Sequence, residues 1–256
     1  MPSMPPKSAH SPQTPKTPWL VVPRPNPSAA RRLVCFPHAG GSASFFRTWA
    51  QHLDPTVELQ VVQYPGRENR IAEPLLGTMD EVASAAARAL RADGRETILF
   101  GHSMGAAVAY EVLRILEADR ASAVTRLCVS GRRLTGPSAD RVITPLTDDE
   151  LIASMGALGG TQSAILEDPD IRAMVLPILR NDYFLIDSYR PDPAAAPVTA
   201  EVVALTGDAD PRVTEAQMKE WARITTGPFA CHTFPGGHFY LAEHSAALAR
   251  IATADI

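Results

Sequence analysis

The chain has 256 residues, 45% of them hydrophobic and 20% charged, and its formal net charge is −4. This composition is typical of a soluble α/β protein with one sizeable core, and a mildly acidic chain without runs of like charge is not expected to bind nucleic acid. No apolar run approaches the ~20 residues that a membrane span requires. Because neither a secretory signal nor an apolar seam beyond the core is recognisable, we expect a cytoplasmic monomer that does not bind membranes.

The N-terminal segment is rich in proline. Nine of the 23 prolines lie before residue 28, mixed with Ser, Thr and Lys. A segment of this composition cannot bury enough apolar surface to fold by itself. We therefore expect a disordered leader at residues 1–28, followed by one folded domain at residues 29–256.

After this leader, strand-like and helix-like segments alternate along the chain. Short apolar runs predict strands at residues 33–36, 59–64, 97–100, 124–129, 202–205 and 229–234. Helical patterns occur at residues 44–53, 79–91, 104–118, 215–225 and 241–252. Several strands are too continuously apolar for a sheet with an exposed face. The pattern predicts an α/β fold whose mostly parallel sheet is covered by helices on both faces.

Residues 135–195 interrupt this alternation. They contain two helical patterns and no convincing strand, and the second pattern begins at Asp168 and Pro169, a typical cap and first-turn pair. Pro177 should interrupt and bend that second helix. We expect a helical insertion that covers the sheet domain as a lid.

A serine between two glycines lies where the strand at residues 97–100 meets the following helix. Gly101, Ser103 and Gly105 match the pattern G-x-S-x-G, in which glycines are needed where a Cβ atom would collide with neighbouring backbone. A structural turn serine is the alternative, but a strand before and a helix after the motif favour an exposed nucleophile. The N-terminus of the helix would also favour a developing negative charge.

A serine nucleophile needs a base, and in this architecture the chain order is Ser, then Asp or Glu, then His. His238 follows the last predicted strand in the loop FPGGHFYL, where two glycines give the backbone freedom to direct its ring. Asp208 and Asp210 both follow the preceding strand. We prefer Asp210, whose loop position should bring a carboxylate to the second ring nitrogen, where it would orient the imidazole and stabilise the imidazolium.

The loop FPHAGGS at residues 36–42 follows the first strand of the predicted domain. In α/β-hydrolases a loop at this place supplies one of two backbone donors to the oxyanion. The N–H groups of Ala39 and Met104 are therefore the candidate donors. A phosphate-binding loop is the weaker alternative, because neither GxxxxGK[ST] nor GxGxxG is present.

Five segments, PHAGGSASFF, QYPGREN, GHSMGAAVAYEV, GDADPRV and FPGGHFYL, occur in this order along the chain. Together they resemble the free-standing type II thioesterases of polyketide and nonribosomal peptide assembly lines, which have the α/β-hydrolase fold. The resemblance covers nearly the whole chain except the leader. Its catalytic residues correspond to Ser103, Asp210 and His238, and its oxyanion amides to Ala39 and Met104.

This resemblance implies a reaction and a partner. The enzyme would hydrolyse stalled or aberrant acyl groups from the phosphopantetheine arm of an acyl or peptidyl carrier protein, through an acyl-serine and without a metal or organic cofactor. A carboxylesterase acting on small free esters, or a cyclase or acyltransferase with another acceptor, would use the same groups. An inactive hydrolase scaffold that serves as a binding protein is the alternative from another class.

The insertion bears on the substrate. Its apolar stripe either lines a chamber for the acyl chain or simply packs on the sheet domain. Met155 and Phe184 in the insertion, together with His38 in the loop after the first strand, are the candidate substrate contacts.

Four arginines in two pairs lie on an otherwise acidic chain. They form either a basic rim that steers an acidic carrier protein or local salt bridges on a solvated surface. The residues are Arg67, Arg70, Arg132 and Arg133.

Overall fold

The computed structural model describes residues 17–91, 94–119, 122–135, 146–159 and 168–255. Their strands form one sheet with the order β1-β3-β2-β4-β5-β6-β7. β1 runs antiparallel to β3, and every other neighbouring pair is parallel, as predicted. The strands are β1 (Leu20–Val21), β2 (Arg31–Phe36), β3 (Val57–Val62), β4 (Glu96–His102), β5 (Val124–Ser130), β6 (Glu201–Gly207) and β7 (Phe229–Phe234).

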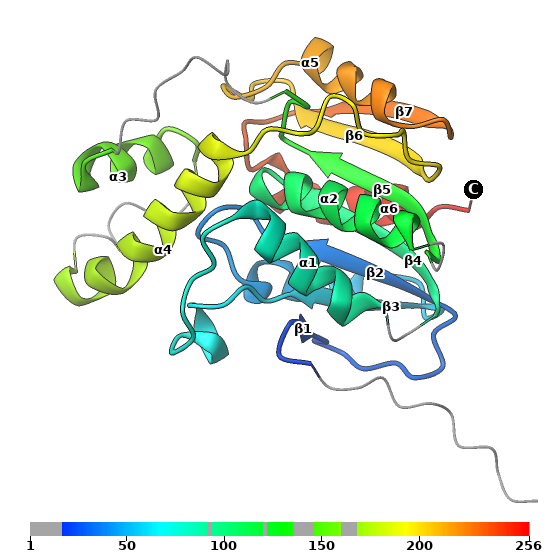
Figure 1. Cartoon of the computed structure of the whole chain (residues 1–256), viewed down its shortest axis with the longest axis horizontal. Helices are drawn as coiled ribbons and strands as arrows, with labels where there is room; N and C mark the ends of the chain where they lie inside the picture. The colour runs from blue at the N-terminus through cyan, green and yellow to red at the C-terminus, as the bar shows by residue number, and fades with distance from the viewer. Residues whose placement is uncertain (1–16, 92–93, 120–121, 136–145, 160–167, 256) are drawn as a thin grey trace, which may run out of the picture.

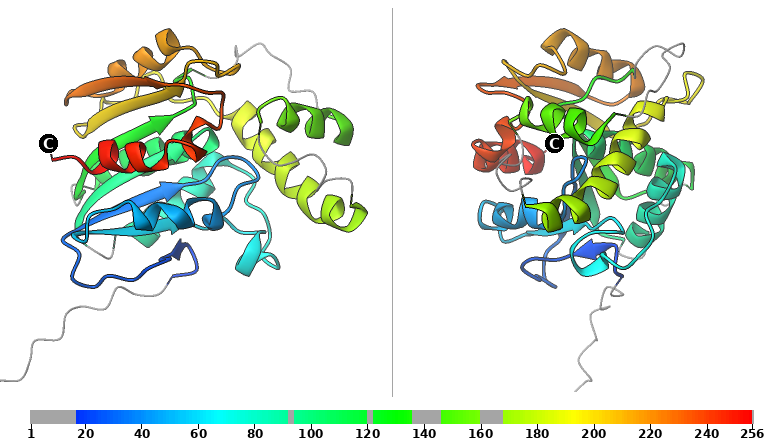
Figure 2. Two further views of the ribbon diagram at one scale, coloured as in Figure 1. Left: turned by 180° about the vertical axis from the view of Figure 1, so that it is seen from behind. Right: turned by 90° about the vertical axis from the view of Figure 1, so that its left-hand side faces the viewer.

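Helices cover both faces of this sheet, which confirms the predicted α/β architecture (Figures 1 and 2). One face carries α1 (Met79–Leu90), α2 (Met104–Ala118), α5 (Glu215–Lys219) and the 3-10 segment η4 (Glu220–Ile224). The other face carries α6 (Ser245–Thr253) and the 3-10 segments η1 (Ala43–Gln51) and η5 (Tyr240–Ala242). The helix expected at residues 44–53 is thus a 3-10 helix, and the one expected at residues 215–225 continues from α5 into η4.

The buried strands alternate between two hydrophobic cores. In β4, Leu99 packs into the core under α1 and α2, whereas Ile98 and Phe100 pack into the core under η1 and α6. Successive side chains of a strand point to opposite faces, so a strand covered on both faces needs an apolar residue at every position. The continuous apolar run in the sequence follows from this double burial.

The N-terminal segment differs from the expectation. Disorder was expected as far as residue 28, but residues 17–28 belong to the described structure and include a strand. Residues 1–16 lie outside the described part of the chain. Leu20 and Val21 form β1 at the edge of the sheet against β3, and the backbone N–H of Gln63 donates to the carbonyl of Trp19 at 2.9 Å. The apolar run WLVV among the prolines explains this docking, because it supplies the surface that the rest of the leader lacks.

Two helices, α3 (Asp148–Gly156) and α4 (Pro169–Ser188), form the described part of the insertion beyond the carboxyl ends of the strands (Figure 1). α4 begins where the sequence predicted, because the Asp168 carboxylate accepts hydrogen bonds from the N–H groups of Asp170 and Ile171. The predicted interruption at Pro177 is wrong, since α4 continues through it. The neighbouring Leu176, Ile178 and Leu179 are buried, which offsets the lost hydrogen bond.

No helix among the described residues is both long enough and apolar enough to cross a membrane.

Candidate active site

Ser103 occupies a strained turn between β4 and α2. Its backbone has φ 53° and ψ −114°, and a positive φ is uncommon for a residue with a side chain. Such a conformation costs about 1–3 kcal/mol and persists only where the surrounding structure imposes it. Here the Ser103 N–H donates to the carbonyl of Ser130 at the end of β5, at 2.8 Å. The turn therefore holds the serine at the edge of the sheet, at the N-terminus of α2.

The two flanking glycines allow the backbone segments around Ser103 to touch. A Cβ atom on Gly101 would lie 2.2 Å from the carbonyl oxygen of Gly105, and one on Gly105 would lie 2.0 Å from the carbonyl oxygen of Phe36. These contacts are far too short for any side chain. They give a physical reason for the G-x-S-x-G pattern: α2 starts directly against the ends of β4 and β2.

His238 and Asp210 form a buried pair on two neighbouring loops. Nδ1 of His238 lies 2.8 Å from Oδ2 of Asp210, and the side chains are 3% and 0% exposed. The other carboxylate oxygen of Asp210 accepts the N–H of Arg212 at 2.8 Å. With Nδ1 held by the carboxylate, Nε2 is the ring nitrogen available to a substrate or a nucleophile.

Asp208 has a different contact. Its carboxylate accepts the N–H of Gly236 at 2.9 Å and so joins the loop after β6 to the loop after β7. The contact to the imidazole thus belongs to Asp210, the residue that the sequence analysis preferred. Gly207 assists the same junction, because a Cβ atom there would lie 2.2 Å from the carbonyl oxygen of Gly236.

Ala39 lies in a tight turn after β2. The Gly41 N–H donates to the carbonyl of His38 at 2.9 Å, and Gly40 has φ 72°, which is the geometry of a type II β-turn. Met104 is the first residue of α2 and follows Ser103 directly. Within the described residues, neither the Ala39 N–H nor the Met104 N–H donates to a protein acceptor. Both amides are therefore free to bind a ligand oxygen.

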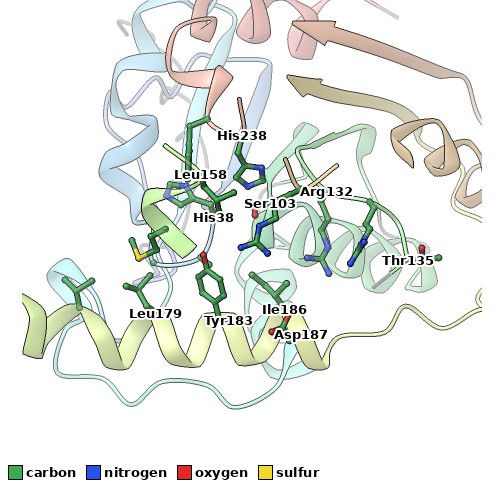
Figure 3. Close-up of a pocket in the computed structure, with 17 residues that line it drawn as sticks. His38, Ser103, Arg132, Thr135, Leu158, Leu179, Tyr183, Ile186, Asp187 and His238 are labelled. Atoms are coloured by element: carbon green, nitrogen blue, oxygen red, sulfur yellow. The ribbon is translucent and has the colours of Figure 1, made fainter. Parts of the chain in front are cut away.

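A cavity of about 160 Å³ lies between these loops and the insertion. Ser103 and His238 both face it from the sheet domain (Figure 3). Arg132, Arg133 and Arg212 line a polar side. The apolar side comes from α3, α4 and the segment just after α3, through Met155, Leu158, Val175, Leu179, Tyr183 and Ile186.

Two of the three candidate substrate contacts line this cavity, namely His38 and Met155. Phe184 does not: its side chain is 52% exposed on another face of α4, so its assignment as a substrate contact is corrected. The periodicity of the helix explains the error. Leu179, Tyr183 and Ile186 recur at intervals of three and four residues and share the cavity face, which excludes Phe184. Tyr183 and Leu179 take its place.

Two further histidines surround His238. The His102 ring lies 4.9 Å from it, is fully buried and shares a 2.9 Å hydrogen bond with the hydroxyl of Ser130. Burial, and then the charges of His238 and His38, hold the pKa of His102 well below its ordinary value. Burial, and then the charges of His238 and Arg67, lower the pKa of His38 to about 3. Both rings are therefore neutral at pH 7. Of the three histidines, His238 contacts a carboxylate and is equipped to accept a proton.

The four arginines do not form an exposed basic rim. Arg67 is buried against Asp182, and Arg70 is buried against Glu73 and lies 4.5 Å over the Trp19 ring. Arg132 is buried beside Tyr189, and it lines the cavity together with Arg133. The alternative of local ion pairs therefore holds for Arg67 and Arg70, and Asp182, the partner of Arg67, was not predicted.

Comparison with known proteins places this geometry in a family. The family described as "Thioesterase domain" matches residues 31–256. The chain belongs to the thioesterase family. This thioesterase is 43% identical over 226 residues to "Thioesterase PikA5" of Streptomyces venezuelae, a match that covers 87% of this chain and 80% of PikA5.

Solved structures agree. The type II thioesterase BorB from the borrelidin biosynthetic cluster has 41% identity and a TM-score of 0.80, with 91% of this chain and 95% of BorB covered. RedJ, the thioesterase from the prodiginine pathway of Streptomyces coelicolor, has 35% identity and a TM-score of 0.80, with 95% of this chain and 92% of RedJ covered. The resemblance to type II thioesterases and the assignment as a thioester hydrolase are confirmed.

Proposed function

We propose that this thioesterase releases stalled or aberrant acyl groups from the phosphopantetheine arms of acyl or peptidyl carrier proteins of an assembly line. The observation that carries the proposal is the strained Ser103 beside the buried His238–Asp210 pair, on the wall of one largely apolar cavity. The similarity to BorB and RedJ, thioesterases of two biosynthetic pathways, supports this substrate class.

In the first half of the proposed reaction, the acyl group moves to the enzyme. Ser103 Oγ attacks the thioester carbonyl while Nε2 of His238 accepts the hydroxyl proton, and Asp210 stabilises the resulting imidazolium. The N–H groups of Ala39 and Met104 bind the oxyanion, and the N-terminus of α2 adds a positive potential. The tetrahedral intermediate breaks its C–S bond and expels a thiolate, which leaves readily. The thiolate takes up the proton from the His238 imidazolium, so His238 is again a neutral base. The acyl group is then an ester of Ser103.

In the second half, water replaces the serine. His238 accepts a proton from the water as its oxygen attacks the ester carbonyl, and the same two amides bind the second oxyanion. His238 then gives the proton to Ser103 Oγ, and the free acid leaves. The cycle consumes one water and one thioester and needs no cofactor.

The chain acts as a monomer in this proposal. Its own helices cover both apolar faces of the sheet, which supports the proposal because no large apolar face of the sheet is left for a second copy. Light scattering coupled to gel filtration should give the mass of one chain, and the mass of two chains would contradict it.

Mass spectrometry of acyl-carrier proteins tests the reaction directly. A panel of carrier proteins loaded with different acyl groups is incubated with the wild type or with Ser103→Ala. Wild type should remove the acyl mass and leave the phosphopantetheine arm, whereas Ser103→Ala should not. Hydrolysis of small soluble esters alone, with all carrier-bound thioesters left intact, would favour a carboxylesterase instead.

A further inference from the structure

A carboxylate from the insertion is buried against the turn that contains Ala39. Oδ2 of Asp182, in α4, accepts the N–H of Gly40 at 2.8 Å. Arg67 forms a two-pronged ion pair with the same carboxylate, at 2.8 Å to Oδ2 and 3.0 Å to Oδ1. The side chains of Asp182 and Arg67 are 1% and 6% exposed, so this contact between α4 and the sheet domain excludes water.

Arg67 holds the other end of the same turn. Its guanidinium donates to the carbonyl of Gly41 at 3.0 Å, while the Arg67 carbonyl accepts from the side-chain amide of Gln63 at 3.0 Å. The Gln63 side chain also accepts the N–H of Ala43 at 2.7 Å. The N–H of Gly40 and the carbonyl of Gly41 are thus fixed by a connected set of buried hydrogen bonds.

α4 also contacts the turn through packing. Leu179 lies about one helical turn before Asp182 and packs against Gly40. A Cβ atom on Gly40 would lie only 2.3 Å from Cδ2 of Leu179. A type II β-turn can exchange with other turn types by rotating its central peptide. Here that peptide joins Ala39 to Gly40 and carries the Gly40 N–H, so its rotation would move the backbone of Ala39. Asp182 and Leu179 contact the turn where this rotation would take place.

We propose that Asp182 is a positioning residue that makes the oxyanion donor at Ala39 depend on the docking of α4. This inference rests on the proposed function, in which the Ala39 N–H binds the oxyanion. With α4 docked, the Asp182 carboxylate fixes Gly40, and the Ala39 N–H is held towards the cavity. With α4 lifted to admit a substrate, Gly40 loses its acceptor, Arg67 loses its counter-ion, and the turn is released.

The arrangement couples the docking of the insertion over the cavity to the completion of the oxyanion hole. The oxyanion hole is complete only when the insertion covers the cavity, so the acyl group is enclosed when Ser103 attacks. Because an unpaired buried guanidinium is unfavourable, Arg67 also draws the carboxylate and its helix back to the docked position. A merely structural ion pair would instead stabilise the fold without affecting the transition state in particular.

Asp182→Asn tests the inference with little change of shape. An asparagine cannot accept from both Gly40 and Arg67 without turning its own amide donors towards one of them. The matched control is Asp149→Asn, which removes an exposed carboxylate in α3 that pairs with Arg172 of α4. Asp182→Ala removes the acceptor completely. Should that variant fail to fold, the double variant Arg67→Met with Asp182→Leu replaces the ion pair by apolar groups and still lacks the acceptor.

Three quantities separate positioning from stability. The first is kcat for an acyl-pantetheine thioester, read together with its KM. The other two are the dissociation constants of two inhibitors. A trifluoromethyl ketone analogue forms a tetrahedral oxyanion when Ser103 Oγ adds to its carbonyl, whereas a thioether analogue of the substrate has no carbonyl at the reacting position. We expect kcat to fall about 10-fold in Asp182→Asn and about 100-fold in Asp182→Ala, with KM nearly constant. Affinity for the ketone should fall in parallel and affinity for the thioether should not.

The control and two contrary outcomes complete the test. Asp149→Asn should keep the wild-type kcat. Wild-type kcat in a folded Asp182→Ala or in the apolar double variant would overturn the inference. So would an equal loss of affinity for the ketone and the thioether. A wild type that hydrolyses no thioester would instead refute the proposed function, so the two failures are distinguishable.

Discussion

Replacing Gly105 by alanine tests how closely the oxyanion site is built. A Cβ atom at this position would lie 2.0 Å from the carbonyl oxygen of Phe36 and 2.7 Å from that of Pro37, where ordinary contacts are 3.4–4 Å. Both neighbours are backbone atoms and cannot rotate away. The first turn of α2 must therefore move from the end of β2 by roughly 1 Å, and overpacking of this kind costs about 1–3 kcal/mol of the free energy of unfolding.

The displacement should lower activity, because it moves α2 away from the turn after β2, and each of these two segments carries one of the two oxyanion amides. Met104 belongs to α2 and Ala39 to the turn after β2. A shift of about 1 Å in a catalytic geometry can cost on the order of 100-fold in rate. We expect kcat for an acyl-pantetheine thioester to fall by about this factor in Gly105→Ala, more than its lower stability explains at 25 °C.

Gly156→Ala provides the matched control. Gly156 ends α3, and a Cβ atom there has no neighbour within 4 Å. This variant should keep the wild-type kcat and gain up to about 1 kcal/mol of helix stability. Urea denaturation and steady-state kinetics measure both effects. Gly105→Ala with wild-type stability and kcat would refute the reasoning from close backbone contact.

Three further predictions concern the histidines and the cavity. Asp210→Asn should lower kcat by about 10⁴-fold in steady-state assays, because the imidazole loses the carboxylate that fixes its tautomer, and a loss below 10-fold would exclude that role. Met155→Ala should shift acyl chain-length preference in competition assays, whereas Phe184→Ala should not, because Met155 lines the cavity and Phe184 is exposed. Equal shifts in the two variants would contradict the assignment of this cavity as the site of the acyl chain. The free energy of unfolding should fall as the pH drops below 6.5, since the buried rings of His102 and His38 both have lowered pKa values and take up protons only in the unfolded chain. Each ring contributes up to about 1.4 kcal/mol per pH unit. His102→Asn should flatten this decline in urea denaturation, and an unchanged slope would contradict the assignment.

The parts predicted from the sequence are those whose signal is local. The turn at Ser103 was predictable because the strand, both glycines and the helix are contiguous in the chain. His238 and Asp210 were predictable because each follows a strong strand pattern, and strand ends of a parallel sheet meet at one edge. The choice of Asp210 over Asp208 depended on a loop position, and the 2.8 Å contact with His238 agrees with it.

The parts that were not predicted depend on distant contacts. Arg67 and Asp182 are 115 residues apart, and nothing in either segment identifies the other as its partner. One signal was present: Asp182 occupies the apolar face of α4, three residues from Leu179 and from Leu185, where a carboxylate needs a buried partner. Phe184 was misassigned because three consecutive apolar residues in a helix cannot share one face, and the rotation of the helix against the domain decides which of them is buried.

Labelling with an active-site fluorophosphonate tests the central claim most directly, namely that Ser103 is activated by His238. Peptide mass spectrometry of the labelled wild type should find one adduct, on the peptide that contains Ser103. The adduct should be absent in Ser103→Ala and should form at least 100-fold more slowly in His238→Gln, since general-base assistance contributes roughly 100- to 10,000-fold. Labelling of His238→Gln at the wild-type rate, or an adduct on another residue, would contradict the account.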